Sequence, residues 1–255
     1  EKTITGDAVL DAGTITPTKI SANTKAGFSI IQYVGTRTST ASDTMSHGLS
    51  SAPELLLMKN LDKNAHWSAY TIHAAGGGYL SLTDAWGTSR ATWMVNDQNP
   101  TNSLITVGWN ADNVNQDGDN HLIYAWHSVP GYSAFGHYTG VQSGKPFVYL
   151  GFKPAWVMIK AVDDNGLNSY QSWSIFDTAR DDYNPCKLPL YANASYIEGL
   201  AGNGSGTTGA SVGGIDIVSN GFIILDGSAS YSGIDNIKHV YMAFAEQPGK
   251  YSNAR

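Results

Sequence analysis

Four short blocks of sequence occur twice in this chain of 255 residues, both times in the same order. The copies are separated by 101 residues for a Pro-initiated apolar run, 106 for a Trp-Ser pair and 118 for a closing Pro-Gly turn. This drift falls mainly at 192–214, a stretch rich in Gly, Ser, Thr and Asn that tolerates insertion. The equivalent positions are Phe28 and Tyr132, Pro53 and Pro154, Trp67 and Trp173, His121 and His239, Tyr124 and Tyr241, Trp126 and Phe244, and Pro130 and Pro248. We therefore predict a tandem duplication.

From Gly27 onward the chain consists of short apolar segments separated by turn-forming residues. The segments 28–34, 54–59 and 67–72 are rich in β-branched, aromatic or aliphatic residues, and Gly, Pro, Asn or Asp lies beside each. No window carries apolar residues at helical spacing over the length of a substantial helix. Strands and turns at this spacing are typical of sandwiches and barrels. We expect an all-β fold with two tandem homologous β-sandwich units, jelly-roll-like in topology.

The first 26 residues differ in character from the rest of the chain. They contain no aromatic residue, and a Thr-Ile-Thr unit occurs twice in them, 11 residues apart. So few apolar side chains cannot offset the cost of ordering a lone chain, about 1–2 kcal/mol per residue. We expect Ile4, Ile15 and Ile20 to face an axis shared by three subunits; a disordered linker is the alternative. The predicted parts are a shaft or linker segment at 1–26, a first unit at 27–130 and a second at 131–255.

Composition argues against two classes of partner. The formal charge is −6, and no stretch clusters the 15 basic residues, so a nucleic-acid partner is not expected. No apolar run approaches the ~20 residues that cross a bilayer, so membrane insertion is not expected either. Charged residues make up only 14% of the chain, where about 25% is ordinary. A surface rich in hydroxyl and amide groups suits a protein that works outside a cell.

The histidines lack the spacing of a metal or catalytic site. They show no H-x-x-x-H or H-E-x-x-H pattern. Only His121 recurs in the duplication, opposite His239, which indicates a role in the fold. The residues are His47, His66, His73, His121, His127, His137 and His239.

Two groups of acidic residues are also weak candidates. The stretch 113–119 resembles the start of a calcium loop, but its twelfth position is Tyr124 instead of a bidentate Glu, so we favour a hairpin loop. Adjacent acidic residues in turns are typical of solvated surface, although glycan hydrolysis needs two carboxylates. The available carboxylates are Asp163, Asp164, Asp181, Asp182 and Asp216. We expect no metal, no cofactor and no enzymatic activity.

The aromatic residues divide into two groups. Those that recur, namely Trp67 with Trp173, Tyr124 with Tyr241 and Trp126 with Phe244, are expected in the core. Five others have no counterpart in the other copy and lie in or beside Gly-, Ser-, Thr- and Asn-rich stretches. Because a flat aromatic face with nearby amides and hydroxyls recognises sugars, these five are candidate ligand-binding residues; packing of loops onto the sandwich is the alternative. They are Trp86, Trp93, Trp109, Tyr196 and Tyr231.

Several motifs in the second half carry a resemblance to a known family. They are Pro146-Phe147-Val148-Tyr149-Leu150-Gly151-Phe152, Phe176-Asp177-Thr178, Ser219-Asn220-Gly221-Phe222 and Ala245-Glu246-Gln247-Pro248. With these motifs, roughly residues 27–255 resemble a duplicated domain near the C-terminus of tail fibre and other virion proteins of marine and cyanobacterial phages. The likeness is strongest over 130–255. The family has no established catalytic motif, so no active-site residue follows from it.

The resemblance implies a virion structural protein, the distal part of a phage tail fibre that attaches to the host cell surface. Its expected partners are itself, as a homotrimer, other virion proteins, and a host surface polysaccharide or receptor. A single cysteine, Cys186, allows no intrachain disulfide and favours assembly in the reducing host cytoplasm before release. The alternatives are a non-adhesive head fibre or capsid decoration protein, and a tailspike depolymerase that digests surface polysaccharide.

Overall fold

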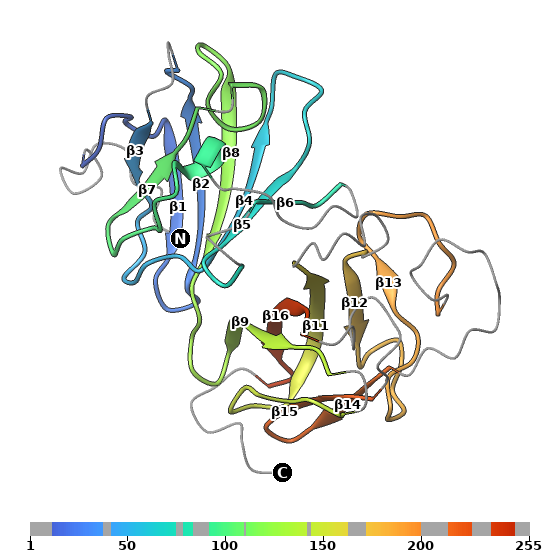
Figure 1. Cartoon of the computed structure of the whole chain (residues 1–255). Coiled ribbons are helices and arrows are strands. Elements are labelled where there is room, and N and C mark those ends of the chain that lie inside the picture. Colours follow the sequence, from blue (N-terminus) through green and yellow to red (C-terminus); the bar gives the residue numbers. More distant parts are fainter. Residues whose placement is uncertain are drawn as a thin grey trace. The chain divides into compact units, whose positions relative to one another are not determined.

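The computed structural model describes residues 12–37, 42–74, 79–83, 92–109, 111–141, 144–162, 172–199, 214–225 and 236–247, with the backbone alone at Tyr79, Thr92, Trp93 and Ala111. Its strands form antiparallel sheets, which confirms the all-β expectation (Figure 1). In the described part of the chain, no helix is long and apolar enough to cross a membrane. The chain divides into two compact units, unit 1 (Glu1–Ser81 and Ser89–Ser128) and unit 2 (Leu82–Thr88 and Val129–Arg255).

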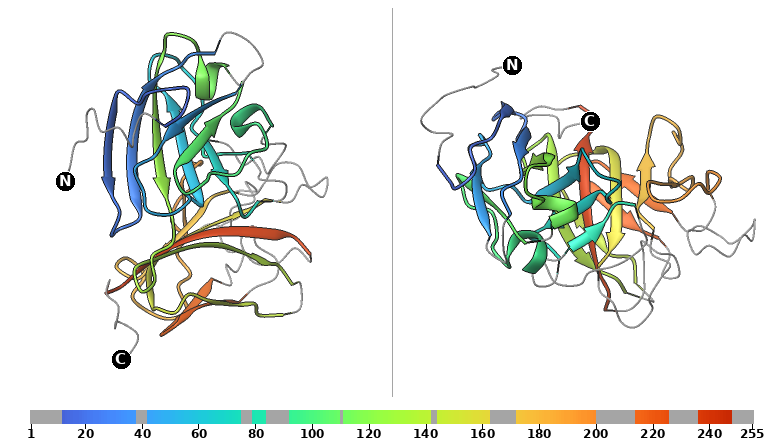
Figure 2. Two further views of the ribbon diagram at one scale, coloured as in Figure 1. Left: turned by 90° about the vertical axis from the view of Figure 1, so that its left-hand side faces the viewer. Right: turned by 90° about the horizontal axis from the view of Figure 1, so that it is seen from above.

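Unit 1 is a six-stranded antiparallel sheet with a pair of strands packed on one face (Figure 2). The sheet has the order β1-β2-β8-β4-β5-β6, formed by β1 (Lys19–Asn23), β2 (Phe28–Val34), β8 (Asn120–Trp126), β4 (Leu55–Asn60), β5 (Ser68–Thr71) and β6 (Tyr79–Ser81). The pair is β3 (Asp43–Ser46) with β7 (Leu104–Val107), while α1 (Thr92–Val95) precedes β7 and the π-helical turn η1 (Ala111–Asn115) precedes β8. Met45 and Ile105 of the pair pack against Ile31 and Ile123 of the sheet, which makes a sandwich.

Unit 2 repeats this two-layer plan. Its larger sheet has the order β13-β12-β11-β16-β9, formed by β13 (Leu190–Tyr191), β12 (Ser174–Asp177), β11 (Pro154–Ala161), β16 (Lys238–Ala245) and β9 (Ser133–Thr139). A three-stranded sheet of order β10-β15-β14 covers it, with β10 (Phe147–Tyr149), β15 (Gly221–Ile224) and β14 (Ile215–Val218). Val148 and Phe222 of the smaller sheet share a core with Val157 and Phe176 of the larger one.

The larger sheets of the two units have the same strand order and the same register. The order β2-β8-β4-β5 in unit 1 corresponds to β9-β16-β11-β12 in unit 2. In unit 1, Leu55 lies opposite Trp126 on one side and Thr71 on the other. Trp156, which follows Leu55 by the predicted 101 residues, lies opposite Phe244 and Asp177 in the same way. A tandem duplication accounts for this agreement, because unrelated sandwiches have no reason to share a register.

A buried Tyr–His stack recurs at the same place in each unit. Tyr33 stacks on His121 with ring centroids 5.2 Å apart, and Tyr138 stacks on His239 at 5.0 Å. Both histidines are fully buried. The prediction that they serve the fold agrees with these positions, since the stacks join β2 to β8 in unit 1 and β9 to β16 in unit 2.

Lys59 and Lys160 are a further equivalent pair. Each Nζ donates to the carbonyl of the next residue, at 2.7 Å to Asn60 and at 3.0 Å to Ala161. Lys160 is fully buried, and burial lowers its pKa to about 7.

The register corrects two of the predicted equivalences. Phe28 lies opposite Trp126, as Ser133 lies opposite Phe244, so Phe28 corresponds to Ser133 and not to Tyr132. Tyr241 lies opposite Gly136, as Ile123 lies opposite Ile31, so Tyr241 corresponds to Ile123 and not to Tyr124. A Cβ on Gly136 would come within 2.5 Å of the Tyr241 hydroxyl. The pair of isoleucines in one core is therefore replaced by a glycine and a tyrosine in the other, which roughly conserves volume.

The expectation that the recurring aromatics are core residues is only partly correct. Trp173 is buried, and Tyr241 packs against the core of unit 2. Tyr124 and Trp126 alternate with the core residues of β8 and therefore project from the other face of the sheet, where they are half-buried. Trp67 is also half-buried and stacks on Tyr124 with ring centroids 5.9 Å apart. Phe244 has the corresponding outward position in unit 2, beside Trp156.

The expectation of an extended segment outside the units is wrong for residues 12–26. Strand β1 pairs with β2 along its whole length. Ile15 and Ile20 are 4% and 2% exposed and belong to the core of unit 1, so they do not face an axis shared with other subunits. A β-unit in the same chain supplies the apolar surface that the short segment lacks. Ile4 lies outside the described residues.

Replacing Trp173 by Ala should destabilise unit 2 by roughly 3–5 kcal/mol, because the side chain is 3% exposed and its removal leaves a cavity. The equivalent Trp67→Ala should cost unit 1 less, about 1–2 kcal/mol, because that ring is half-buried. Chemical denaturation of both variants and the parent measures the difference. Equal losses in the two variants would contradict the burial of the two rings.

Candidate functional site

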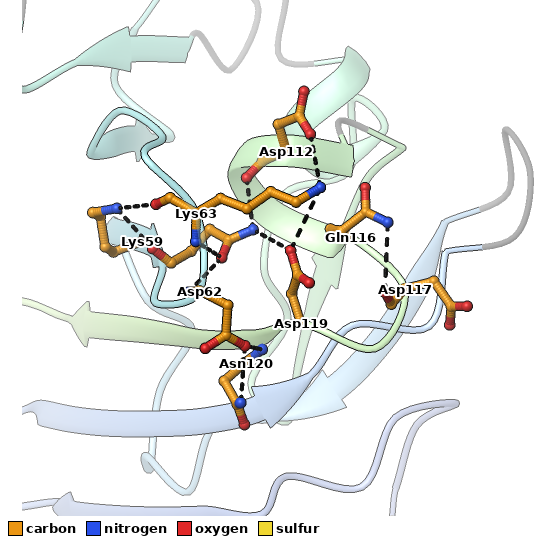
Figure 3. A network of polar contacts seen from close by, with 9 residues as sticks. Lys59, Asp62, Lys63, Asp112, Gln116, Asp117, Asp119 and Asn120 are labelled. Atoms are coloured by element: carbon orange, nitrogen blue, oxygen red, sulfur yellow. Dashed lines mark hydrogen bonds and ion pairs between the residues drawn. The ribbon is translucent and has the colours of Figure 1, made fainter.

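A polar network in unit 1 includes Asp62, Lys63, Asp112 and Asp119 (Figure 3). At its centre is the buried side chain of Asn60, at the end of β4. Its Nδ2 donates to the Asp112 carbonyl and to Asp119 Oδ2, both at 2.9 Å. Its Oδ1 accepts from the backbone N–H groups of Asp62 at 2.9 Å and Lys63 at 3.1 Å. One amide thus ties the turn after β4 to η1 and to the start of β8.

Charged groups at the edge of this network add little energy. The Lys63 ammonium lies 3.4 Å from Asp112 Oδ1 and 3.8 Å from Asp119 Oδ2, with the lysine side chain 42% exposed. Asp62 Oδ2 accepts from the backbone N–H of Asn120 at 2.6 Å and from its side chain at 2.9 Å (Figure 3). These hydrogen bonds lower the pKa of Asp62. The hydrogen bonds of Asn60 and Asp62 in this network hold loops in place.

The stretch that resembles a calcium loop is not a hairpin. It connects β7 to β8, which lie in different sheets, and it begins as η1. Asn115 is fully buried: its Oδ1 accepts from the Thr36 N–H at 3.1 Å and its Nδ2 donates to Asp43 Oδ2 at 3.0 Å. Within the described ranges, no three His, Cys, Asp or Glu side chains are grouped so as to hold a metal ion.

His47 is the most constrained histidine outside the two Tyr–His stacks. It is fully buried, and its Nε2 lies 3.1 Å from the Thr101 carbonyl. The Leu49 N–H donates to its Nδ1 at 3.2 Å, which assigns the proton to Nε2. Burial lowers the pKa of His47, and the nearby His127 adds to this effect.

The five candidate ligand-binding aromatics do not form one described site. Trp86 and Tyr231 lie outside the described residues, and for Trp93 only the backbone in α1 is described. Trp109 is half-buried just after β7 in unit 1. Tyr196 is 37% exposed in unit 2, where its ring meets the buried ring of Tyr191 edge-on at 5.8 Å.

Tyr196 belongs to a segment at 178–199 that Arg180 holds in place. The Arg180 N–H and Nε donate to the two carboxylate oxygens of Asp177 at 2.9 and 2.6 Å. Its Nη1 donates to the Leu188 carbonyl at 3.2 Å and to the Glu198 carboxylate. The segment therefore presents its side chains from a backbone fixed at both ends, which lowers the ordering cost of any binding.

The described structure places three of the five acidic residues considered for catalysis, all in unit 2. Asp163 and Asp164 lie outside the described residues. Asp181 Oδ2 accepts from the backbone N–H groups of Lys187 and Leu188, which is a loop-forming role. Asp182 is exposed, and Asp216 lies half-buried on β14.

Sequence reasoning missed three strongly exposed aromatic residues, all in unit 2. They are Phe147, Tyr149 and Tyr183, with 50%, 68% and 80% of their surface exposed. Phe147 and Tyr149 alternate around Val148, and this period of two is a signal that they share one face of a strand. The sequence does not say which face is covered, because both are apolar.

Replacing Asn60 by Ala should destabilise unit 1 by about 2–4 kcal/mol, because it removes four hydrogen bonds around a buried position. Urea denaturation at neutral pH measures this loss. Asp117→Ala is the control, from the connection between η1 and β8 that Asn60 holds; its side chain is exposed, and the change should alter stability by less than about 0.5 kcal/mol. A loss in the control as large as in Asn60→Ala would contradict the central role of the amide.

Acid should weaken unit 1 partly through His47. Its folded pKa lies below the unfolded value of about 6.5, so the unfolded chain binds more protons in this window and stability falls as the pH drops through it. Burial lowers the pKa of His121 as well, which gives the same sign. The drop in unfolding free energy from about pH 7.5 to about pH 5 should be smaller in His47→Gln than in the parent. His66→Gln, at an exposed position, should keep the parent's drop; the same drop in both variants would refute the assignment.

Comparison with known protein families gives a match over most of the chain. Residues 5–248 match the family described as Domain of unknown function (DUF7483). No match was found among curated proteins or among solved structures. The match extends over both units, and the chain therefore belongs to the DUF7483 family.

Proposed function

We propose that the chain is the distal part of a phage tail fibre and attaches the virion to the surface of the host cell. The observation that carries the proposal is a difference between two units built on one plan. Among the described residues, all four exposed aromatics, Phe147, Tyr149, Tyr183 and Tyr196, belong to unit 2. Since unit 1 folds without them, these side chains serve contact with something outside the fold.

Other features support the same proposal. The motifs around Phe147 and Ser219 resemble those of phage tail fibre proteins. The low content of charged residues, 14%, leaves a surface that binds through neutral hydrogen bonds and aromatic contacts. The hydrogen bonds of Arg180 to Asp177 and Leu188 order the segment that carries Tyr196, as suits a recognition surface.

Assembly as a homotrimer is part of the proposal and rests on the resemblance alone. The earlier argument from a shared axis no longer applies to Ile15 and Ile20, which are buried within their own unit. Light scattering of the purified chain measures the mass of the assembly directly.

The proposal is tested on the virion itself. Gold-labelled antibodies raised against the purified chain should mark the distal ends of the tail fibres in electron micrographs. Host cells incubated first with the purified chain should adsorb fewer virions, because the free protein occupies the same receptors. Label on the head would assign the chain to a head fibre or capsid decoration, and shortened host polysaccharide after incubation would assign it to a depolymerase.

A further inference from the structure

The three-stranded sheet of unit 2 ends in an edge strand with two exposed aromatic rings. Phe147 and Tyr149 of β10 are 50% and 68% exposed, while Val148 between them is buried in the core. Alternate residues of a strand share one face, so both rings stand on the outer face of the sheet. Their centroids lie 6.4 Å apart.

Two glycines lie close to the rings. Tyr149 lies opposite Gly221 in the ladder, and a Cβ built on Gly221 would lie 2.0 Å from the Val148 carbonyl oxygen and 3.2 Å from Phe147 Cε2. A Cβ on Gly151 would lie 3.6–3.9 Å from atoms of the Tyr149 ring. Neither glycine adds a side chain beside the rings, whose planes are inclined to each other at 68°.

Uncharged polar groups lie at the Tyr149 end of this face. The turn between β14 and β15 consists of Ser219 and Asn220, both exposed. The Asn220 carbonyl accepts from the N–H groups of Leu150 at 2.9 Å and Gly151 at 3.2 Å, which fixes the turn beside the end of β10. The turn that carries a hydroxyl and an amide thus lies beside the end of β10 that holds Tyr149.

The charge of the face favours a neutral ligand. Its outward residues form two rows across the sheet, Asp216, Ile223 and Phe147 in one and Val218, Gly221 and Tyr149 in the other. Asp216 is the one carboxylate in these rows, and Lys145 lies just before β10 with the opposite charge. A polyanion would find no net attraction on such a face.

The fold does not require this aromatic pair. In chain order, β3 lies between β2 and β4 of unit 1, as β10 lies between β9 and β11 of unit 2. Strand β3 (Asp43–Ser46) contains no aromatic residue. Exposed aromatics on an edge strand carry a risk of aggregation. Their presence in one copy alone therefore indicates a binding role.

We propose that Phe147, Tyr149, Ser219 and Asn220 form a binding surface for a neutral polysaccharide. The apolar C–H faces of pyranose rings stack on the two aromatic rings, while the hydroxyl and amide groups bind sugar hydroxyls. This inference rests on the proposed function, for which it supplies the ligand class and the residues.

The test is affinity electrophoresis of the full chain through native gels that contain a neutral glucan, galactan, mannan or xylan, with anionic alginate as a further gel. At least one neutral gel should retard the parent, and alginate should not. Phe147→Ala and Tyr149→Ala should each weaken this binding by about tenfold or more. Tyr149→Phe, which keeps the ring, should retain most of it. Both alanine variants should melt like the parent, since the replaced rings are exposed.

Leu61→Ala is the control, because Leu61 is an apolar side chain that is 48% exposed in unit 1, away from the proposed surface. It should bind like the parent. No retardation in any neutral gel, unchanged retardation of Tyr149→Ala, or loss of retardation in Leu61→Ala would overturn the proposal. So would a self-association that Tyr149→Ala abolishes without any glycan binding, because β10 would then pair with a second copy.

This outcome is separable from that of the proposed function. A chain found on the virion head that still binds neutral glycan through Tyr149 contradicts the tail-fibre role and leaves the site in place. A chain found at the fibre tip that no neutral gel retards contradicts the site alone.

Discussion

In each unit, the last strand of the sequence pairs with two strands that come much earlier in the sequence and lies between them in the sheet. In unit 1, β8 lies between β2 and β4, so that Ile123 pairs with both Ile31 and Met58. In unit 2, β16 lies between β9 and β11 in the same way. These contacts are non-local and close the sheet only when the whole unit has been assembled. The buried Tyr–His stack lies within this pairing, so the core and the register are determined together.

A scaffold fixed in this way leaves the connections and outer faces free to differ. Unit 1 uses a buried amide, Asn60, to tie two loops together, and the equivalent position in unit 2 is Ala161. Unit 2 instead carries the segment held by Arg180 and an edge strand with exposed aromatics. Since the two copies share their sheets, the differences between them point to the surfaces that act on other molecules.

Much of the fold follows from the sequence, and the errors have a common physical cause. The strands and the repeated positions were predicted because alternation and recurrence are local features of a sequence. The assignment of Tyr124 and Trp126 to the core failed because both faces of β8 are apolar, and a period of two does not say which face is covered. Trp67 lies just before β5 and stacks on Tyr124, so it is half-buried as well. The burial of Ile15 and Ile20 in unit 1 was not predicted, because an apolar segment can pack against a neighbouring unit of the same chain as well as against another subunit.

By itself, the sequence determined that this protein is built from strands and that four blocks recur in the same order, because alternation and recurrence are features of residue order. The exact pairing of some repeated positions, such as Tyr241 with Ile123, came from the register. Only the tertiary structure decided which residues meet. The turn at Ser219 and Asn220 comes to lie beside Tyr149, about seventy positions earlier, through a ladder of backbone hydrogen bonds whose register depends on packing beneath it. The exposure of Phe147 and Tyr149 was decided in the same way, because the core of unit 2 covers the Val148 side of β10 and leaves the other side to solvent.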